Sequence, residues 1–511
     1  MALSAEEQQT SKTQKLKMSS KLDKSFQTFW RNRQSRLQSF KVNNKNGMYD
    51  DNWLKRMSKM PKFDIPEKFN SFNTEINAIG IDLGTSSCCV AVNREDRIEV
   101  VAIDITGERT LPSFVGYDEE NVKCGKVVVG NLGMYSKSTI FDTKRIIGKT
   151  YAEIEIEIDP TWSFKVVEDG ESVKLEVQGY MNTTLRQTPE EVASALLNYM
   201  KQKAEEFQKK AIDNVVITIP ASFTDNQKES TLKAAELAGL IHVHLLPEPV
   251  AASITYFTDR ILPNNETILL FDLGGGTLDI CIFEVNNFNF KIIRNTGDAN
   301  IGGRNFDKLL YEYFKEELLS RHGINVELKD TRKYKLMLKC QEIKHNLSAL
   351  NDERICVDDY GPSIDAPPIE ITRQNFENMS VDFVNDIKIL VKYATDNLPN
   401  PIAKVLHVGG SSRMPLIKSM LIQMFPNAEQ CCEVHPEEVV AVDDPPSVDC
   451  ENSKFCVQYV LKEGDIETKF QGCGNNNVYP TSDFSTEYTV AGTRNVNFKK
   501  TTGQDRLLLN I

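Results

Sequence analysis

The sequence predicts an α/β protein with more than one domain, on three observations. First, its 511 residues exceed the length of about 100–200 residues that is usual for one domain, so we expect two to four domains and a large core. Second, short β-branched runs at residues 78–83, 215–219 and 267–271 alternate with stretches of helical periodicity. Third, an Asp-Leu-Gly pattern followed by Thr ends two of these runs, which indicates an internal duplication.

Composition excludes several other classes of protein. Hydrophobic residues make up 40% of the chain and charged residues 26%, which is typical of globular domains. No run approaches the roughly 18–20 apolar residues of a membrane span, and the N-terminus has no secretory signal. The eleven cysteines include no C-x-x-C pair, so reduced thiols are more plausible than a zinc module. We expect a soluble, cytoplasmic protein with no transmembrane segment and no nucleic-acid partner.

The N-terminal segment differs in charge from the rest of the chain. Residues 1–75 carry fifteen Lys and Arg against eight Asp and Glu, a net charge of +7, whereas the remainder carries −19. The first twenty residues have a disordered composition, and residues 21–40 show apolar side chains at helical spacing. Such a basic amphipathic helix is able to contact a membrane surface or a partner protein. A helix that docks on its own protein or stays solvated is the more ordinary interpretation.

The middle of the chain carries clear helix and strand signals. Thr188-Pro189-Glu190-Glu191 predicts a helix start with a capping box, because the threonine hydroxyl and Glu191 can satisfy each other's backbone N–H groups. The inner face of this helix is expected to hold Val192, Leu196, Tyr199, Met200 and Phe207. Residues 215–219 then form a buried strand that Pro220 closes.

The alternation of strands and helices ends near Ala441. Pro445 and Pro446 stop the helix expected over residues 436–442, because tandem prolines cannot continue it. Short alternating runs at 455–461, 486–490 and 496–499 then predict a small or incomplete β-module. We therefore divide the chain into an N-terminal extension (1–75), an α/β domain (76–444) and a β-rich remnant (445–511).

The duplicated motif carries the chemistry. Asp82-Leu-Gly84-Thr85 recurs as Asp272-Leu-Gly-Gly-Gly-Thr277, each time at the end of an apolar strand. Glycines let backbone N–H groups approach phosphate oxygens, and the threonine hydroxyls add donors. The two carboxylates are suited to hold a hydrated Mg²⁺ against those phosphates. One glycine-rich turn is more often a tight hairpin, but two copies at strand ends favour a phosphate site.

The pair of motifs resembles the two phosphate-binding turns of the actin, sugar kinase and heat-shock ATPase superfamily. Finer matches resemble the three signatures of the 70-kDa heat-shock chaperone family: IGIDLGTSSCCVAV at 79–92, FDLGGGTLDICI at 271–282 and VLHVGGSSRMP at 405–415. The resemblance covers residues 76–441 and is highly specific. It implies a two-lobed actin-like ATPase built from duplicated ribonuclease H-like subdomains, with the basic N-terminal extension and the incomplete β-module attached. It also implies ATP and ADP as ligands, with Mg²⁺ and K⁺ as cofactors.

The resemblance assigns roles to individual residues. Lys144 stands where the family has its catalytic lysine, which orients the attacking water, and Glu248, Asp272 and Thr277 complete the implied catalytic set. The implied metal-binding acids are Asp82, Glu248, Asp272 and Asp279. The implied nucleotide-binding residues are Gly84, Thr85, Ser86, Gly274, Gly275, Gly276, Thr277, Gly302, Gly303, Lys344, His345, Ser348, Gly409, Gly410, Ser411 and Arg413.

The chain also departs from the family pattern near the nucleotide. Ser87 stands where most members have tyrosine, and His345 replaces the arginine that stacks on adenine. A neutral histidine supplies less cation–π attraction, by about 0.5–2 kcal/mol at most. Gln341 replaces an acid on the same helix. Nucleotide affinity is therefore expected to fall below the family norm.

Further departures concern partners. His244 replaces a basic residue near the family's co-chaperone surface, and no acidic-leucine linker follows Pro446. Residues 475–511 resemble only the opening strands of the family's peptide-binding sandwich, so we expect impaired or absent peptide trapping.

Three functions follow from this reading. The favoured one is an ATP-hydrolysing heat-shock-type chaperone protein, with unfolded polypeptides and co-chaperones as partners. The alternative is a nucleotide-binding adaptor or regulator of other chaperones with little turnover. A small-molecule kinase of the same superfamily is a third reading, which would need a second-substrate pocket.

Overall fold

The computed structural model describes residues 78–94, 97–104, 107–155, 158–159, 161–170, 172–212, 214–258, 265–286, 289–361 and 366–432, together with short strands within 62–64 and 457–507. The expected amphipathic helix at 21–40 and the helix at 436–442 lie outside these residues. The division of the chain at residues 75 and 444 therefore stays a prediction.

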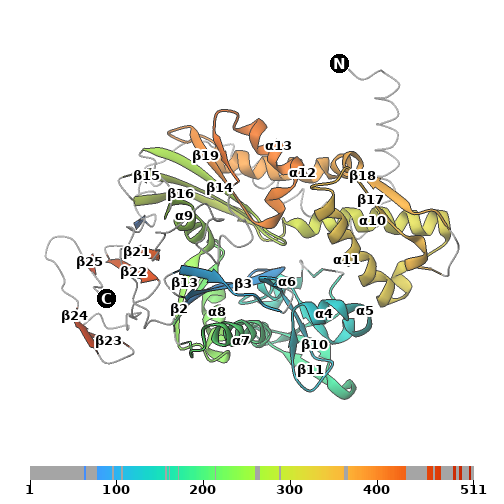
Figure 1. Ribbon diagram of the computed structural model, residues 1–511, viewed down its shortest axis with the longest axis horizontal. Coiled ribbons are helices and arrows are strands. Elements are labelled where there is room, and N and C mark those ends of the chain that lie inside the picture. The colour runs from blue at the N-terminus through green and yellow to red at the C-terminus, as the bar shows by residue number, and fades with distance from the viewer. Residues whose placement is uncertain are drawn as a thin grey trace.

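The first lobe is built on a mixed sheet in the order β13-β12-β2-β3-β4. Its strands are β2 (Ala78–Asp82), β3 (Ser87–Arg94), β4 (Arg97–Val100), β12 (Asn214–Ile219) and β13 (His242–Pro247), and β5 (Thr110–Pro112) pairs with β3. Strand β12 runs parallel to β2 and β13, whereas β2, β3 and β4 are antiparallel. Helices α7 (Pro189–Gln208) and α8 (Asp225–Leu237) lie together below this sheet (Figure 1).

The second lobe repeats this topology with different strands. Its sheet has the order β1-β16-β15-β14-β19-β20, with β1 (Lys62–Asp64), β14 (Glu266–Leu273), β15 (Leu278–Asn286), β16 (Asn289–Asp298), β19 (Ile402–Val408) and β20 (Glu429–Cys431). Strand β19 runs parallel to β14 and β20, whereas β14, β15 and β16 are antiparallel. The order β20-β19-β14-β15-β16 therefore matches β13-β12-β2-β3-β4, which confirms the predicted duplication and the two-lobed α/β fold.

The remaining elements extend each lobe. In the first lobe these are β6 (Phe114–Gly116), β7 (Lys123–Cys124), α4 (Lys126–Gly130), α5 (Leu132–Tyr135), β8 (Thr139–Phe141), the 3-10 turn η3 (Thr143–Arg145), α6 (Tyr151–Glu155), β9 (Lys165–Asp169), β10 (Ser172–Gln178) and β11 (Thr184–Gln187). In the second lobe they are α9 (Glu248–Thr258), α10 (Gly303–His322), α11 (Asp330–Asn346), β17 (Asp352–Ile355), β18 (Ile369–Thr372), α12 (Arg373–Thr395), the 3-10 turn η7 (Gly410–Arg413) and α13 (Pro415–Met424).

The strongest sequence signals are found in the structure. Thr188 and Glu191 form the expected capping box, with Glu191 N 3.2 Å from Thr188 Oγ1 and Thr188 N 2.7 Å from Glu191 Oε2. Val192, Leu196 and Met200 are buried on the inner face of α7, with Tyr199 and Phe207 packed at its edge.

Short strands also occur near both ends of the chain. Strands β21 (Val457–Glu463), β23 (Glu487–Val490) and β24 (Arg494–Asn497) overlap the three alternating runs, and β22 (Ile466–Gly472) and β25 (Arg506–Leu507) join β21 in a sheet. Strand β1, from the N-terminal segment, pairs antiparallel with β16.

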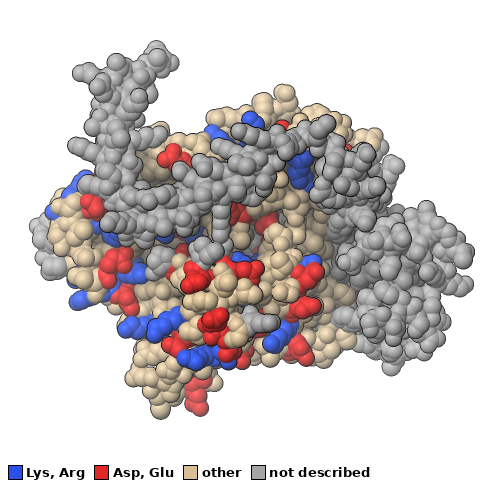
Figure 2. Space-filling model, turned by 180° about the vertical axis from the view of Figure 1, so that it is seen from behind, with Lys and Arg blue, Asp and Glu red and all other residues tan. Residues whose placement is uncertain are grey.

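Hydrogen bonds join the first lobe to α11 of the second. Tyr334 of α11 donates a hydrogen bond of 2.9 Å to the carbonyl of Thr161, and Ser136 donates one of 2.9 Å to Asp330. On the face shown in Figure 2, acidic and basic side chains of the described residues are interspersed. Within the described part of the chain, no helix has both the length and the hydropathy needed to cross a membrane.

Candidate nucleotide-binding site

Four carboxylates, three of them buried and that of Asp82 partly buried, gather with one lysine where the two central sheets face each other. Asp82 ends β2, Asp272 lies near the end of β14, and Asp279 stands opposite Asp272 on β15. Glu248 is the first residue of α9, directly after β13. Lys144, in η3, places its ammonium 2.5 Å from Glu248 Oε1, and only 9% and 8% of the two side chains are exposed. The structure thus brings together all five predicted ionisable residues of the site.

The ionisation of this cluster reflects its excess of negative charge. Burial, with Glu248 nearby, raises the pKa of Asp82 and of Asp279 to about 7, while Lys144 opposes the rise. Burial and the neighbouring acids raise the pKa of Asp272 well above its ordinary value. Although burial lowers the pKa of Lys144, the attraction of Glu248, Asp82 and Asp279 outweighs it and raises that pKa.

The cluster is suited to a hydrated cation. Four carboxylates share one ammonium, so a divalent ion would relieve their repulsion. Among the described residues, no group of three or more His, Cys, Asp or Glu side chains is arranged to ligate a metal directly. The carboxylate cluster itself is suited to a Mg²⁺ ion held through its waters.

The two predicted phosphate turns lie face to face. A Cβ atom added to Gly275 would lie 2.0 Å from Ser86 Oγ, and one added to Gly276 would lie 2.8 Å from Thr85 Cγ2. The β2–β3 turn is braced from behind, since Ser113 Oγ donates a hydrogen bond of 2.7 Å to the carbonyl of Gly84. Thr277 closes the β14–β15 turn by accepting a hydrogen bond of 3.0 Å from Gly274 N. Side chains at these glycines would separate the two turns.

Two further glycine turns of the second lobe, at Gly302–Gly303 and Gly409–Gly410, contact the β14–β15 turn and Asp272. Gly303 N donates a hydrogen bond of 3.0 Å to the carbonyl of Gly274, and a Cβ on Gly302 would lie 2.6 Å from the backbone of Gly275. Gly409, at φ +77°, leaves its Cβ position 2.5 Å from Asp272 Oδ1, and Gly410 begins η7 beside it. Ser411 is buried, with its hydroxyl 2.4 Å from the Cβ position of Gly303.

Of the residues predicted to hold the base, Lys344 and His345 lie at the end of α11, Ser348 follows that helix, and Arg413 ends η7. Lys344 is buried and binds Asp307 Oδ1 at 2.9 Å and the carbonyl of Gly303 at 3.2 Å. Loss of hydration, together with the cations Lys344 and Arg413, lowers the pKa of His345, so its ring is neutral at pH 7. Ser348 donates a hydrogen bond of 3.3 Å to the carbonyl of Lys344. Lys344 therefore contacts the Gly302–Gly303 turn, and Arg413 is near enough to His345 to affect the pKa of its ring.

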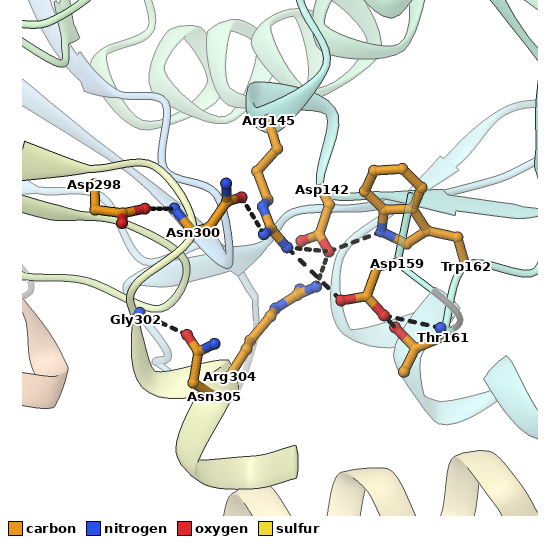
Figure 3. A network of polar contacts seen from close by, with 10 residues as sticks. All are labelled: Asp142, Arg145, Asp159, Thr161, Trp162, Asp298, Asn300, Gly302, Arg304 and Asn305. Carbon is orange, nitrogen blue, oxygen red and sulfur yellow. Dashed lines mark hydrogen bonds and ion pairs between the residues drawn. The ribbon is translucent and has the colours of Figure 1, made fainter. Parts of the chain in front are cut away.

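Sequence reasoning missed a polar network beside this site. Asp142, Arg145 and Trp162 of the first lobe meet Asn300 and Arg304 of the second (Figure 3). It also missed Thr218, whose hydroxyl lies 3.4 Å from Asp82 Oδ1. Arg145 follows the predicted catalytic lysine, but nothing in the local sequence points to partners on the other lobe.

Comparisons with known proteins agree with this geometry. The sequence profile described as "Hsp70 protein" matches residues 78–444. A heat shock 70 kDa protein of Emericella nidulans is 34% identical over 398 residues, which cover 77% of this chain and 59% of that protein. Heat shock cognate 70 kDa protein 3 of Dictyostelium discoideum is 32% identical over 375 residues, which cover 72% and 59%.

A third relative shows a similar identity and coverage. The heat shock cognate HSP70 protein of Trypanosoma brucei brucei is 32% identical over 370 residues, which cover 71% of this chain and 55% of that protein. The match thus spans between about half and three-fifths of these relatives' own length. Because the profile matches most of the sequence, including both lobes and all of the site residues described above, the chain belongs to the Hsp70 family.

Proposed function

We propose that this protein binds ATP and ADP with Mg²⁺ and hydrolyses ATP to ADP and phosphate. The observation that carries the proposal is the meeting of Lys144 with four buried or partly buried carboxylates at the point where two glycine turns face each other. This arrangement combines an anion-binding backbone, a cation and a carboxylate cluster, which phosphoryl transfer requires together. Membership of a family of ATPases supports it.

Mg²⁺ would be held through water by Asp82, Glu248 and Asp272, whose carboxylates belong to one cluster. Asp279 and Thr277 would serve a K⁺ ion, as the family resemblance implies. When bound, Mg²⁺ supplies charge neutralisation and orientation of the β- and γ-phosphates.

Separate groups of the protein would bind the phosphates, orient the attacking water and accept its proton. Backbone N–H groups of Gly84, Thr85 and Ser86 hold the phosphates from one lobe, and those of Gly274, Gly275 and Gly276 hold them from the other. Lys144, held in place by Glu248, orients the attacking water and stabilises charge on the γ-phosphate. Asp272, which belongs to the same cluster, would accept the proton of that water in its ionised form.

The base and ribose would lie against the second lobe. Gly302, Gly303, Gly409, Gly410 and Ser411 form the turns on which the nucleoside rests. His345 and Arg413 flank the base, with Lys344 and Ser348 beneath them.

Single-turnover hydrolysis of radiolabelled ATP tests this proposal. We expect phosphate release that depends on Mg²⁺, is abolished by EDTA, and is lost in Lys144→Met. Equal hydrolysis by the wild-type and Lys144→Met proteins would overturn the role of the lysine.

A second function is favoured by two observations. Lys144 is held in a short ion pair by Glu248, and the neutral His345 stands where the family places a cationic arginine. A protein that retains nucleotide with little turnover, and that acts as an adaptor or regulator of other chaperones, also fits this site. Stoichiometric nucleotide found after purification, with negligible turnover, would favour this function over hydrolysis.

The chaperone role rests on the family and on relatives named as heat shock proteins. We infer that unfolded polypeptides and co-chaperones are partners of the whole protein, and that it acts in the cytoplasm. Peptide trapping is expected to be impaired. Single-turnover hydrolysis with and without an unfolded peptide tests this, because stimulation by the peptide would contradict impaired coupling.

A further inference from the structure

Two arginines connect the lobes beside the candidate site (Figure 3). Arg304, in the first turn of α10 on the second lobe, forms an ion pair with Asp142 Oδ2 of the first lobe. Arg145, from η3 of the first lobe, donates a hydrogen bond of 2.6 Å to Asn300 Oδ1 of the second. The Arg304 guanidinium also lies 5.3 Å from the ring centroid of Phe141 of the first lobe, which is within the range of a cation–π contact.

Asp142 depends on this contact. Its side chain is fully buried, its backbone has φ +64°, and Trp162 Nε1 donates a hydrogen bond of 3.0 Å to the same oxygen that Arg304 contacts. Arg145 of the first lobe lies farther from that oxygen, with its Nη1 4.0 Å away. Separation of the lobes would remove Arg304 and leave a buried carboxylate poorly compensated, which is costly.

The same contacts join the two halves of the nucleotide site. Asp142 directly precedes η3, which carries Lys144, and its carbonyl accepts a hydrogen bond of 2.9 Å from Arg145 N. On the other lobe, Arg304 N donates a hydrogen bond of 2.8 Å to the carbonyl of Gly275. The turn with the candidate catalytic lysine is thus tied to the turn with the candidate phosphate-binding glycines.

We propose that Asp142, Arg145, Asn300 and Arg304 form an interlobe latch, which holds Lys144 opposite the Gly275 turn and opens when nucleotide leaves. Asp142 and Arg304 are positioning residues, since they act through the segments that they fix. The nucleotide-release part of the latch rests on the proposed nucleotide binding, whereas the contact between lobes does not.

Hydrogen exchange on the nucleotide-free protein tests the latch without any ligand. Asp142→Asn removes the charge, retains an acceptor for Trp162 and tolerates the left-handed backbone. Arg304→Gln removes the opposite charge, and Arg186→Gln at an exposed ion pair on β11 is the matched control. We expect Asp142→Asn to speed exchange at residues 298–306 of the other lobe, and Arg304→Gln to speed it at residues 139–147. Faster exchange confined to the mutated lobe would overturn the latch.

The rate at which a fluorescent ADP dissociates tests whether the latch controls nucleotide release. We expect each single variant to release ADP about tenfold faster, and the double variant no faster than either, because both remove one coupled contact. Arg304→Lys should restore part of the slow release, and Arg186→Gln should match the wild type. Unchanged or additive rates would overturn the claim that the latch governs release. If the wild-type protein bound no ADP, the proposed function would fail, while hydrogen exchange would still decide whether the latch exists.

Discussion

The ammonium of Lys144 lies 2.5 Å from the carboxylate of Glu248, and this contact joins segments 104 residues apart in the sequence. The lysine comes from the 3-10 turn after β8, and the glutamate begins the helix after β13. Each charge compensates the other in a place with little access to water. The lysine is therefore fixed in position before any nucleotide arrives, so its removal should affect hydrolysis more than nucleotide affinity.

Lys144→Met is expected to reduce single-turnover ATP hydrolysis by about 10²–10³-fold, because a group that stabilises transition-state charge is removed. ADP affinity, measured by calorimetry, should change only a few-fold. Lys137→Met, at an exposed lysine nearby, is the control and should retain full activity. Parallel losses of affinity and rate in Lys144→Met would show that the lysine serves binding instead of hydrolysis.

The stability of the nucleotide-free, metal-free protein should depend on pH through Asp82 and Asp279. Burial first, and Glu248 second, raise the pKa of both to about 7 in the folded chain, whereas an unfolded aspartate titrates near pH 4. The folded state binds more protons between these values, so the contribution of each group to the free energy of unfolding falls as pH rises from about 4 to about 7.

Asp279→Asn replaces this carboxyl group with an amide that does not titrate. The variant should therefore not lose the free energy of unfolding that Asp279 costs the wild type as pH rises. We expect its stability relative to the wild type to grow between pH 5 and pH 8, by on the order of 2 kcal/mol. Urea unfolding at four pH values measures the difference, with Asp382→Asn, at an exposed position on α12, as the matched control. A difference between Asp279→Asn and the wild type that stayed constant with pH would be inconsistent with a raised pKa at this site.

Gly302→Ala should disrupt nucleotide binding for steric reasons alone. Gly302 has φ −171°, which any residue adopts, but its Cβ would lie 2.6 Å from the backbone of Gly275. The crowding should cost about 1–3 kcal/mol of stability and weaken ADP binding at least tenfold. Gly130→Ala is the control, because nothing lies within 4 Å of its Cβ position. If Gly302→Ala bound ADP as tightly as the wild type, the Gly275 turn would have to move aside at little cost in free energy.

His345→Arg should strengthen ADP binding by about 2–10-fold, because a guanidinium gains cation–π attraction to adenine that the neutral imidazole lacks. The pKa of His345 is lowered by loss of hydration and by Lys344 and Arg413, so the ring carries no charge at pH 7. Calorimetric titration of both proteins with ADP measures the change. Weaker binding by the arginine variant would indicate that repulsion from Lys344 and Arg413 exceeds the stacking gain.

Much of the fold was predictable because its signals are local. Strands β2, β12 and β14 begin within one residue of the predicted runs. Apolar and β-branched residues mark all three strands, a glycine turn follows β2 and β14, and Pro220 follows β12. The start of α7 was predicted because a capping box needs only four consecutive residues. The duplication was recognised from a motif that both sheets carry at the same strand end.

The interlobe contacts were not predictable in the same way. Arg145 and Asn300 are 155 residues apart and belong to loops whose approach depends on the packing of two whole lobes. Lys344 was predicted near the base, but its pairing with Asp307 was not, since an acid on a neighbouring helix leaves no periodic signal. The roles of the site residues remain predictions that the experiments above address.

Strand β1 covers the backbone of β16 at the margin of the second-lobe sheet, through the register Lys62–Lys291 to Asp64–Asn289. An uncovered margin of this kind can recruit a strand from another molecule. A chain from which residues 62–64 were deleted should therefore self-associate as its concentration rises, which light scattering would detect. Residues 62–64 thus protect the edge of the second-lobe sheet from pairing with another molecule. The other strands of that sheet begin more than two hundred residues further along the chain.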